Sequence, residues 1–410
     1  MKKLIIFLTI LLVIPFASCD KEKPAEIPEL NFSDTKKAAD LIEADSEFGL
    51  DLFAKVMNMQ SVPENVMISP LSVAMALGMT YNGAEGDTRT AFEQTLRTQG
   101  FTRSEINYIH NTLLTYLLEA DPRVVLEIAN SIWSRQGFDV LQSFIDTNKF
   151  YYHAEVRELN FDDPAAKDII NAWVAIKTHD KIKDILDAIP GDAVMYLINA
   201  IYFNGMWTYQ FDTKDTYTST FNKADNSIAQ VKFMKLKDKV AYLKNDLFSA
   251  IELMYGNQKF SMCLIRPNDG KTTTDVVSEL NMDNYTSWMS GLTKQEVNVI
   301  IPKFKFGFKE LLNDPLKEMG LSIAFTDLAD FTGINPQGNL LISKVIHQSF
   351  IDVNEKGTEA AAATVVEVSL TSAGPEIPTF KADKPFIFLI REKASNAILF
   401  MGRVGLPEYQ

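Results

Sequence analysis

The sequence is poor in the residues from which metal sites and disulfide frameworks are built. Its 410 residues include two cysteines and four histidines, which are Cys19, Cys263, His110, His153, His179 and His347. No two histidines have the HExxH spacing of a zinc site, and no CxxC motif is present. We therefore expect neither a metal site nor a cofactor.

Motifs of enzyme active sites are missing as well. There is no G-x-S-x-G elbow, no P-loop and no G-x-G-x-x-G motif after a strand. A serine–histidine–acid triad could be assembled from distant residues of any chain of this length, and nothing local favours one. The sequence is therefore typical of a protein that acts without being an enzyme.

Positive charge is scarce, because 40 Lys and Arg residues face 53 Asp and Glu residues and leave a formal net charge of −13. Such an acidic chain argues against nucleic acid, or the anionic face of a membrane, as the main partner. Hydrophobic residues make up 46% of the chain, which is enough for a substantial core. The length alone allows one large domain or two ordinary ones.

The N-terminus has the order of parts of an export signal. Two lysines precede an apolar stretch, 4–16, that is too short to span a bilayer, and Ala17 and Ser18 lead to Cys19. This ending resembles the lipobox of bacterial lipoproteins, in which the cysteine is acylated and becomes the new N-terminus, although Phe16 stands where leucine is usual. The alternative is an ordinary secretory signal with an incidental cysteine.

On the lipoprotein interpretation, residues 1–18 are a signal peptide and 19–38 form a flexible tether after lipidated Cys19. We then expect a monomer held by lipid on the cell envelope, in the periplasm or exposed at the surface of the outer membrane. Cys263 would have no cysteine left to pair with. It lies in the apolar run FSMCLI, which favours a buried small hydrophobic residue over a reactive thiol.

Hydrophobic spacing predicts several elements. Helical spacing marks the segments 48–56, 106–117 and 170–176. Ser69 and Pro70 are typical of a helix start, and Asn82-Gly83 of its end. The run 194–203 is nearly all apolar, as expected of a central strand buried on both faces. Strand-like runs dominate the second half, which predicts an α+β fold with a large mixed or antiparallel sheet.

The stretch NEKGTEAAAATVVEVSLTSAGPEIP, 354–378, suits more than one structure, because its alanines favour a helix, its valines a strand and its end a loop. Within 358–369, the even positions are small or β-branched and uncharged, and they are Thr358, Ala360, Ala362, Thr364, Val366 and Val368. The odd positions carry both carboxylates, Glu359 and Glu367. One face of this segment could therefore enter a sheet without burying a charge.

Seven segments, in order, resemble the serpin family. They are NVMISPLSVAMAL, INAWVAIKTHDKI, LINAIYFNGMW, IPKFKF, LKEMGLSIAFTDLADFTGI, LLISKVIHQSFIDVNEKGTEAAAAT and KPFIFLIREKASNAILFMGRV. The resemblance implies a single domain, 39–410, with three β-sheets, eight or nine helices and an exposed reactive-centre loop at about 355–378. The segment THDKI departs from the family, since His179-Asp180 replaces a polar residue followed by glycine, and this predicts a changed helix end.

The resemblance implies an inhibitor that acts as a suicide substrate. A target protease attacks the loop, and the cleaved loop enters the main sheet before the covalent acyl-enzyme hydrolyses, a known example of strand addition. Non-inhibitory members act as binding or chaperone-like proteins, and that is the alternative function. The hinge sequence GTEAAAAT has no proline and no bulky residue, which favours inhibition.

The resemblance also assigns roles to residues. The loop hinge would consist of Glu355, Gly357, Thr358, Glu359, Ala360, Ala361, Ala362 and Ala363. A polar cluster beneath the point where the sheet opens would consist of Ser69, Ser72, Asn199 and His347. Trp207 would be the aromatic residue at the top of the sheet, where insertion begins. Helix capping for Ser69, and plain core packing for His347 and Trp207, are the alternatives.

The scissile bond can be placed by counting. Seventeen residues from Glu355 inclusive, the common inhibitory spacing, end at Thr371, with Ser372 after it. The alternatives are the bonds Leu370–Thr371, Ser372–Ala373 and Gly374–Pro375, of which the last precedes proline and is a poor protease substrate. These side chains are small or aliphatic and uncharged, which favours elastase-like, subtilisin-like or papain-like proteases over trypsin-like ones.

Overall fold

The structure of the chain is a computed structural model that describes residues 29–32, 35–61, 64–358 and 377–409. Its α-helices are α1 (Thr35–Met59), α2 (Pro70–Tyr81), α3 (Gly86–Thr95), α4 (Arg103–Glu119), α5 (Gln142–Tyr152), α6 (Ala166–Lys177), α7 (Thr273–Ser278), α8 (Met282–Gly291) and α9 (Asn313–Leu316). Short turns of other helix types follow at η1 (Thr213–Asp215), η2 (Lys317–Leu321) and η3 (Ser322–Phe325). Nine α-helices in the described ranges agree with the expected eight or nine.

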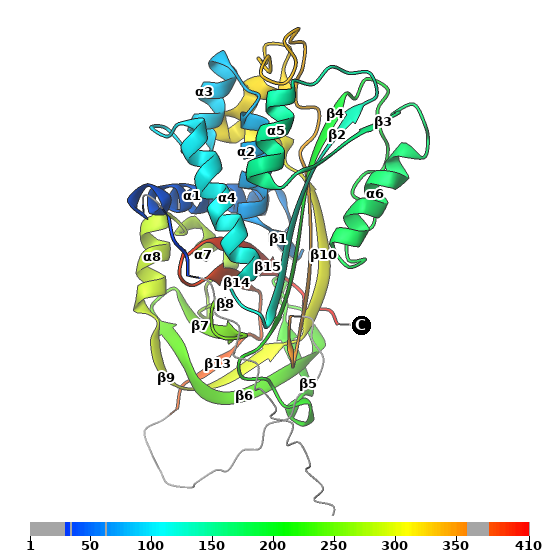
Figure 1. Cartoon of the computed structure of the whole chain (residues 1–410). Coiled ribbons are helices and arrows are strands. Elements are labelled where there is room, and N and C mark those ends of the chain that lie inside the picture. The colour runs from blue at the N-terminus through cyan, green and yellow to red at the C-terminus, as the bar shows by residue number, and fades with distance from the viewer. Residues whose placement is uncertain (1–28, 33–34, 62–63, 359–376, 410) are drawn as a thin grey trace, which may run out of the picture.

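The strands form two hydrogen-bonded sheets (Figure 1). The six-stranded sheet has the order β10 (Phe304–Leu311), β11 (Ile346–Asn354), β12 (Gly357–Thr358), β4 (Met195–Met206), β2 (Val124–Arg135), β3 (Glu155–Leu159). The nine-stranded sheet has the order β1 (Val66–Ile68), β15 (Ile398–Val404), β14 (Phe386–Glu392), β8 (Phe260–Pro267), β7 (Phe248–Tyr255), β6 (Ile228–Lys244), β9 (Thr293–Pro302), β13 (Thr379–Lys381), with β5 (Tyr217–Asn222) on β6.

The expected second and third sheets are joined here by one long strand. β6 pairs with β5 along 228–233, with β9 along 233–242 and with β7 along 241–244. Because these three pairings share a single strand, hydrogen bonds link all nine strands into one network. The strand-like run 296–306, EVNVIIPKFKF, also divides between the sheets, since β9 ends at Pro302 and β10 begins at Phe304 in the other sheet.

Two cores hold these layers together. The larger lies between the two sheets and the helices α1, α2 and α4 (Figure 1), and it includes Phe48, Phe53, Leu114 and Phe388. The smaller lies between α6 and the other face of the six-stranded sheet, around Trp133, Ile170 and Trp173. Both faces of this sheet are therefore covered, which suits an apolar strand such as β4.

The predicted helix boundaries are confirmed in part. The Ser69 side chain caps α2 by accepting the N–H of Ser72, and Asn82 follows the last helical residue. In α6, Ile176 is 74% exposed instead of buried, because its position on the helix lies away from the stripe formed by Ile170, Trp173 and Val174.

Two further boundaries can be compared with the sequence. α1 begins at Thr35, before the predicted domain start at Ala39, and Ala38 is already fully buried. After α6 the chain turns through His179 and Asp180, whose φ angles of 50° and 63° are left-handed, so aspartate occupies a conformation that favours glycine.

No helix among the described residues has both the length and the apolar character needed to cross a bilayer.

Candidate functional site

The candidate site is a slot in the six-stranded sheet between β4 and β11. At one end β12 pairs with both strands, and Thr358 lies opposite Gly205 of β4 and Val353 of β11. Because β12 is antiparallel to both, β4 and β11 run parallel to each other. Beyond β12, the described residues of these two strands form no ladder with each other, and a cavity of about 320 Å³ lies there against α2 and the segment 339–347. β12 and the cavity therefore mark the place where one further strand could enter if β4 and β11 moved apart.

The prediction that the strand at 194–203 is buried on both faces is confirmed for its second half, since the residues 200–203 are all buried, and is wrong for its start. The first three residues of β4, Met195, Tyr196 and Leu197, are only half-buried, and all three line the cavity. An apolar strand with a partly open edge can lose more water when another strand covers it. β4 is a central strand, as its sequence predicts, but its neighbour β12 pairs with it over two residues only.

The four residues of the predicted polar cluster lie together at the slot. The Ser69 backbone N–H donates to His347 Nε2 at 3.2 Å, and Ser69 Oγ accepts from the N–H of Ser72. The Ser72 hydroxyl donates to Asn199 Oδ1, and Asn199 Nδ2 donates to Asn130 Oδ1 at 2.7 Å. The chain of hydrogen bonds thus joins α2, β4, β2 and β11 across the slot. Its role in opening the sheet stays a prediction.

Burial sets the protonation state of His347. The side chain is 5% exposed, and this removal from water lowers its pKa to about 4. Because Nε2 accepts the Ser69 N–H, a neutral ring with its proton on Nδ1 fits the observed contact. The sequence offered core packing and the polar cluster as alternatives for His347, and in the structure this histidine does both.

The hinge begins inside the sheet at β12. Thr358 is 3% exposed, and its hydroxyl is 2.8 Å from the hydroxyl of Tyr255. Gly357 has a φ of 151°, and a Cβ there would lie 2.1 Å from the carbonyl oxygen of Gly205. Only glycine fits so close to the backbone of β4. The side chain of Thr358 points into the core.

Trp207 lies next to this hinge, at the end of β4. Its indole N–H donates to the carbonyl of Asn354 at 3.0 Å, and its backbone N–H donates to the carbonyl of Lys356. The indole stacks on Tyr255 with 4.3 Å between ring centroids. Trp207 therefore holds the residues between β11 and β12, in addition to packing in the core.

Glu355 is fastened beside the hinge by a buried ion pair. Lys303 Nζ lies 2.8 Å from Glu355 Oε2, and the hydroxyl of Thr216 donates to Oε1 at 2.7 Å. Burial alone would raise the pKa of Glu355, but the hydrogen bonds from Lys303 and Thr216 outweigh it, so the pKa lies below its ordinary value. The carboxylate is thus charged and held at neutral pH.

The C-terminal residues cover the same ion pair. Lys303 Nζ lies 4.2 Å from the centre of the Tyr409 ring, and the Lys305 N–H donates to the carbonyl of Glu408. Burial, together with the charge of Asp352, raises the pKa of Tyr409 to about 12. Sequence reasoning missed Lys303, Tyr409, Tyr255 and Asn130, because only their distances in space reveal them.

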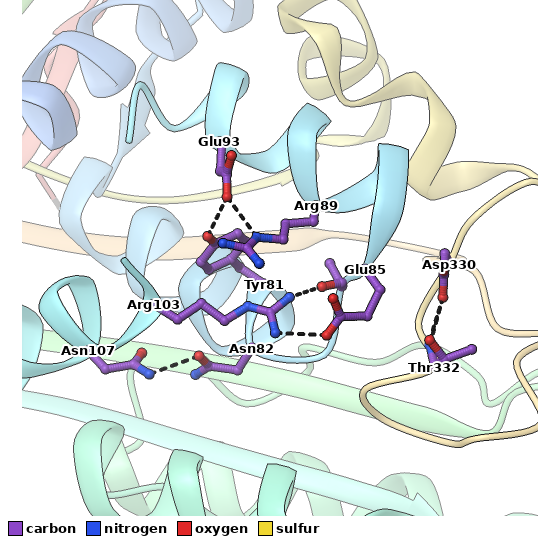
Figure 2. A network of polar contacts seen from close by, with 10 residues as sticks. Tyr81, Asn82, Glu85, Arg89, Glu93, Arg103, Asn107, Asp330 and Thr332 are labelled. Atoms are coloured by element: carbon purple, nitrogen blue, oxygen red, sulfur yellow. Dashed lines mark hydrogen bonds and ion pairs between the residues drawn. The ribbon is translucent and has the colours of Figure 1, made fainter. Parts of the chain in front are cut away.

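The far end of the slot rests on a network of polar contacts (Figure 2). Arg103 pairs with Glu85 at 2.8 Å and also donates to the carbonyl of Ala84. The hydroxyl of Tyr81 donates to Glu93. These bonds tie α2, α3 and α4 together, and the Glu85 N–H reaches the carbonyl of Asp330. The end of α2 and the segment near Phe331, which both line the cavity, are therefore held in place.

Part of the predicted site lies outside the described residues. This holds for the hinge residues Glu359, Ala360, Ala361, Ala362 and Ala363, for the reactive-bond candidates Leu370, Thr371, Ser372 and Ala373, and for the lipidation site Cys19. Cys263, in contrast, is described. It is fully buried, and burial raises the pKa of its thiol to about 12, so the prediction of an unreactive core residue is confirmed.

Comparison with known proteins identifies this architecture. A family model described as Serpin (serine protease inhibitor) matches residues 43–407. The chain belongs to the serpin family. Human Serpin B8 is 35% identical over 376 residues, which are 90% of this chain and 100% of that protein. A serpin-like protein of Methanosarcina acetivorans is 38% identical over 385 residues, 90% of this chain and 88% of its own.

Solved serpin structures superpose on the chain. The thermophilic serpin tengpin in its native state matches with a TM-score of 0.83 and 29% identity, over 92% of this chain and 96% of tengpin. Human thyroxine-binding globulin in complex with its hormone matches with a TM-score of 0.83 and 26% identity, over 91% of this chain and 100% of the globulin. The predicted serpin fold is confirmed. Serpins are generally protease inhibitors and not enzymes, and a thyroxine-binding globulin shares their fold.

Proposed function

We propose that this serpin inhibits serine or cysteine proteases by trapping the acyl-enzyme, and that the slot between β4 and β11 receives the cleaved loop. The observation that carries the proposal is β12. Gly357 and Thr358, which directly precede the loop, already pair with β4 and with β11. A strand that continued from them in the same direction would run between β4 and β11. The alternative is a non-inhibitory binding or chaperone-like protein, and the likeness to thyroxine-binding globulin supports it.

The register of β12 predicts where the inserted residues would lie. Counting six residues on from Thr358 gives Thr364, and counting six residues back from Gly205 and Val353 gives Asn199 and His347. Insertion in the same register would thus place a threonine hydroxyl opposite two members of the polar cluster. The remaining inward positions hold alanine or valine, which suit the apolar walls.

Length is consistent with the same event. About fifteen extended residues, from Gly357 to Thr371, span on the order of 50 Å. The twelve residues of β4 span roughly 40 Å. A strand cleaved at Thr371–Ser372 could therefore run the full length of the slot and carry an attached protease to the far end of the molecule.

The decisive experiment uses the alternation of side chains along a strand, which would place even-numbered residues after Thr358 on the core side. The wild-type chain and the variants Ala362→Glu and Ala363→Glu are mixed with subtilisin and with elastase, and adducts that survive boiling in detergent are counted. Wild type should form the adduct, and Ala363→Glu should keep more of it than Ala362→Glu, because position 363 would lie opposite Ala200 and Gln348 on the α6 side of the sheet and not in the larger core. Ala362→Glu should be cleaved while the protease stays active, because its carboxylate would be buried without a partner.

Two outcomes would contradict the proposal. If both variants trap the protease equally well, the loop does not insert with the alternation that β12 sets. If the wild type is cleaved by several serine and cysteine proteases and traps none, the binding or chaperone-like alternative is favoured.

The lipobox-like N-terminus supports a related proposal about location. We infer that Cys19 is acylated and holds the inhibitor on the cell envelope as a monomer, in the periplasm or at the outer surface. Metabolic labelling with a palmitate analogue should mark the wild-type chain and leave Cys19→Ser unlabelled. Labelling of Cys19→Ser would contradict it.

A further inference from the structure

A row of lysines runs along the solvent face of β6. Lys235, Lys237 and Lys239 occupy alternate positions and are all exposed, whereas Met234 and Val240 on the other face are buried. Alternate residues of a strand share one face, so three positive charges follow one another at intervals of roughly 7 Å. This pattern stands out in a chain whose net charge is −13.

The neighbouring strands add two further lysines to the same face. Lys294 of β9 lies opposite Ala241 of β6, and Lys381 of β13 lies opposite Ile300 of β9, which in turn lies opposite Lys235. Directly opposed residues in paired strands point to one side of the sheet. We call the set of Lys235, Lys237, Lys239, Lys294 and Lys381 the lysine face.

Acidic side chains neutralise this face only in part. Glu296 lies opposite Lys239 and pairs with Lys237 at 3.3 Å, and Asp383, just beyond β13, pairs with Lys381 at 3.2 Å. No ion pair with another described residue is found for Lys235, Lys239 or Lys294. The face therefore keeps a clear excess of positive charge.

The position of the lysine face links it to the reactive loop. β13 begins at Thr379, directly after the loop segment, and the Asn298 N–H donates to the carbonyl of Pro378. Lys303, three residues beyond the β9 residue opposite Lys381, pairs with Glu355 next to the hinge. β5, β6, β9 and β13 lie together at one end of the molecule (Figure 1). The described residues on both sides of the loop segment are therefore fastened to β9 or to the residue that follows it.

We propose that the lysine face is a second contact surface for the target protease and favours proteases with an acidic surface beside their active-site cleft. This inference rests on the proposed function, because a protease that attacks the loop must stand over β13 and its neighbours. Its chemistry follows from complementarity, since five lysines on one face of the sheet attract carboxylates and speed up encounter at low salt. The loop would select the cleaved bond, and the lysine face would select the protease that carries the matching charge.

The test compares a triple variant with a matched control. The first carries Lys235→Glu, Lys239→Glu and Lys294→Glu. The control carries glutamate at three exposed lysines elsewhere, which are Lys36, Lys149 and Lys183, so both variants have the same net charge. Glutamine at the same three face positions gives a milder second variant, and the thermal midpoint of each verifies folding.

The probe is subtilisin in its native form and after succinylation, which converts its lysines to carboxylates. At 50 mM NaCl the rate of adduct formation with succinylated subtilisin should fall at least about tenfold in the face variant, while the control changes by less than about twofold. At 500 mM NaCl the difference should largely vanish because the charges are screened. The number of inhibitor molecules consumed per protease should not change.

A second readout separates this inference from the proposed function. Succinylated subtilisin with its catalytic serine replaced by alanine can bind but cannot acylate, so its affinity reports the encounter alone. If it binds wild type more tightly than the face variant and yet active subtilisin forms no adduct, the lysine face stands and the inhibitory function fails. If adducts form and the face and control variants behave alike, the lysine face is wrong and the function stands.

Two more outcomes would overturn the inference. Absence of any binding of the serine-to-alanine enzyme to wild type would leave the face without a protease partner. A face-dependent binding of a sulfated polysaccharide, with unchanged rates toward both forms of subtilisin, would assign the lysines to a polyanion instead.

Discussion

The Ser69 N–H donates to the unprotonated Nε2 of His347, and this hydrogen bond makes the polar cluster sensitive to pH. Protonation would place a second donor against the Ser69 N–H and a charge inside the core. Because the pKa of His347 is lowered to about 4 from an ordinary 6.5, the unfolded chain binds a proton that the folded chain does not between these values. The contribution of this residue to stability is therefore complete above pH 6.5 and is lost as the pH falls toward 4.

We predict that replacing His347 by glutamine reduces the acid sensitivity of the native state. In the wild type, His347 should lower the free energy of the first unfolding transition by about 1.4 kcal/mol for each pH unit below 6.5. The total loss should reach roughly 3 kcal/mol. Urea titrations at pH 7.5 and pH 5 measure it. The glutamine variant shares every other titrating group, so equal pH slopes in both proteins would contradict the prediction.

At the scale of elements, β12 matters more than its two residues suggest. It is the only described segment that pairs with both β4 and β11, and it sets the register for anything that follows it into the slot. Its fit depends on Gly357, which lies against the carbonyl of Gly205. Trp207, Tyr255 and the Glu355–Lys303 pair hold it from three sides.

We predict that Gly357→Ala converts the inhibitor toward a substrate. Its methyl group would overlap the backbone of β4, so β12 would leave the sheet and the loop would start from outside the slot. When the variant is mixed with active protease, more of the chain should be cleaved and less should form adduct than in the wild type. Densitometry of the two bands on a gel measures this ratio.

Gly270→Ala provides a control for that variant. Gly270 has a φ of 79° but no atom near the place of a Cβ, so this change strains the backbone without a close contact. Equal losses of adduct in both variants would mean that backbone strain, and not the contact with Gly205, decides the result.

At the scale of the whole molecule, the two sheets play different parts. The nine-stranded sheet forms a continuous network of hydrogen bonds, whereas the six-stranded sheet keeps two long strands apart beside a cavity. A further strand between β4 and β11 would satisfy backbone groups on both edges and cover the half-buried start of β4. If the loop inserts as proposed, we expect the chain with its loop inserted to be more stable than the chain with its loop uncut.

We predict that a single cut in the loop raises the unfolding temperature. About ten new backbone hydrogen bonds at roughly 1 kcal/mol each, together with the buried side chains, should shift the midpoint upward by on the order of 10 °C. Differential scanning calorimetry before and after brief treatment with a metalloprotease, which cuts without forming an acyl-enzyme, measures it. The Ala362→Glu chain, cut in the same way, should show a much smaller rise, and an unchanged midpoint in cut wild type would contradict insertion.

The sequence predicted the parts of this fold that local patterns determine. Ser69 and Pro70 mark the start of α2, apolar runs mark β4, β14 and β15, and family segments place Asn199 and His347 at one site. It could not reveal contacts between residues far apart in the chain, such as Glu355 with Lys303 or Tyr409 over that lysine. The lysines of β6 alternate visibly in the sequence, but only the register of three strands adds Lys294 and Lys381 to them.

The buried thiol of Cys263 has a consequence for following such a transition. It lies in β8, in the middle of the nine-stranded sheet and away from the slot, and β7 and β14 flank it. Widening of the other sheet leaves this cysteine hidden, whereas global unfolding uncovers it. If Cys19 is acylated as proposed, we expect the thiol of Cys263 to stay unreactive during loop insertion and to react only when the fold is lost.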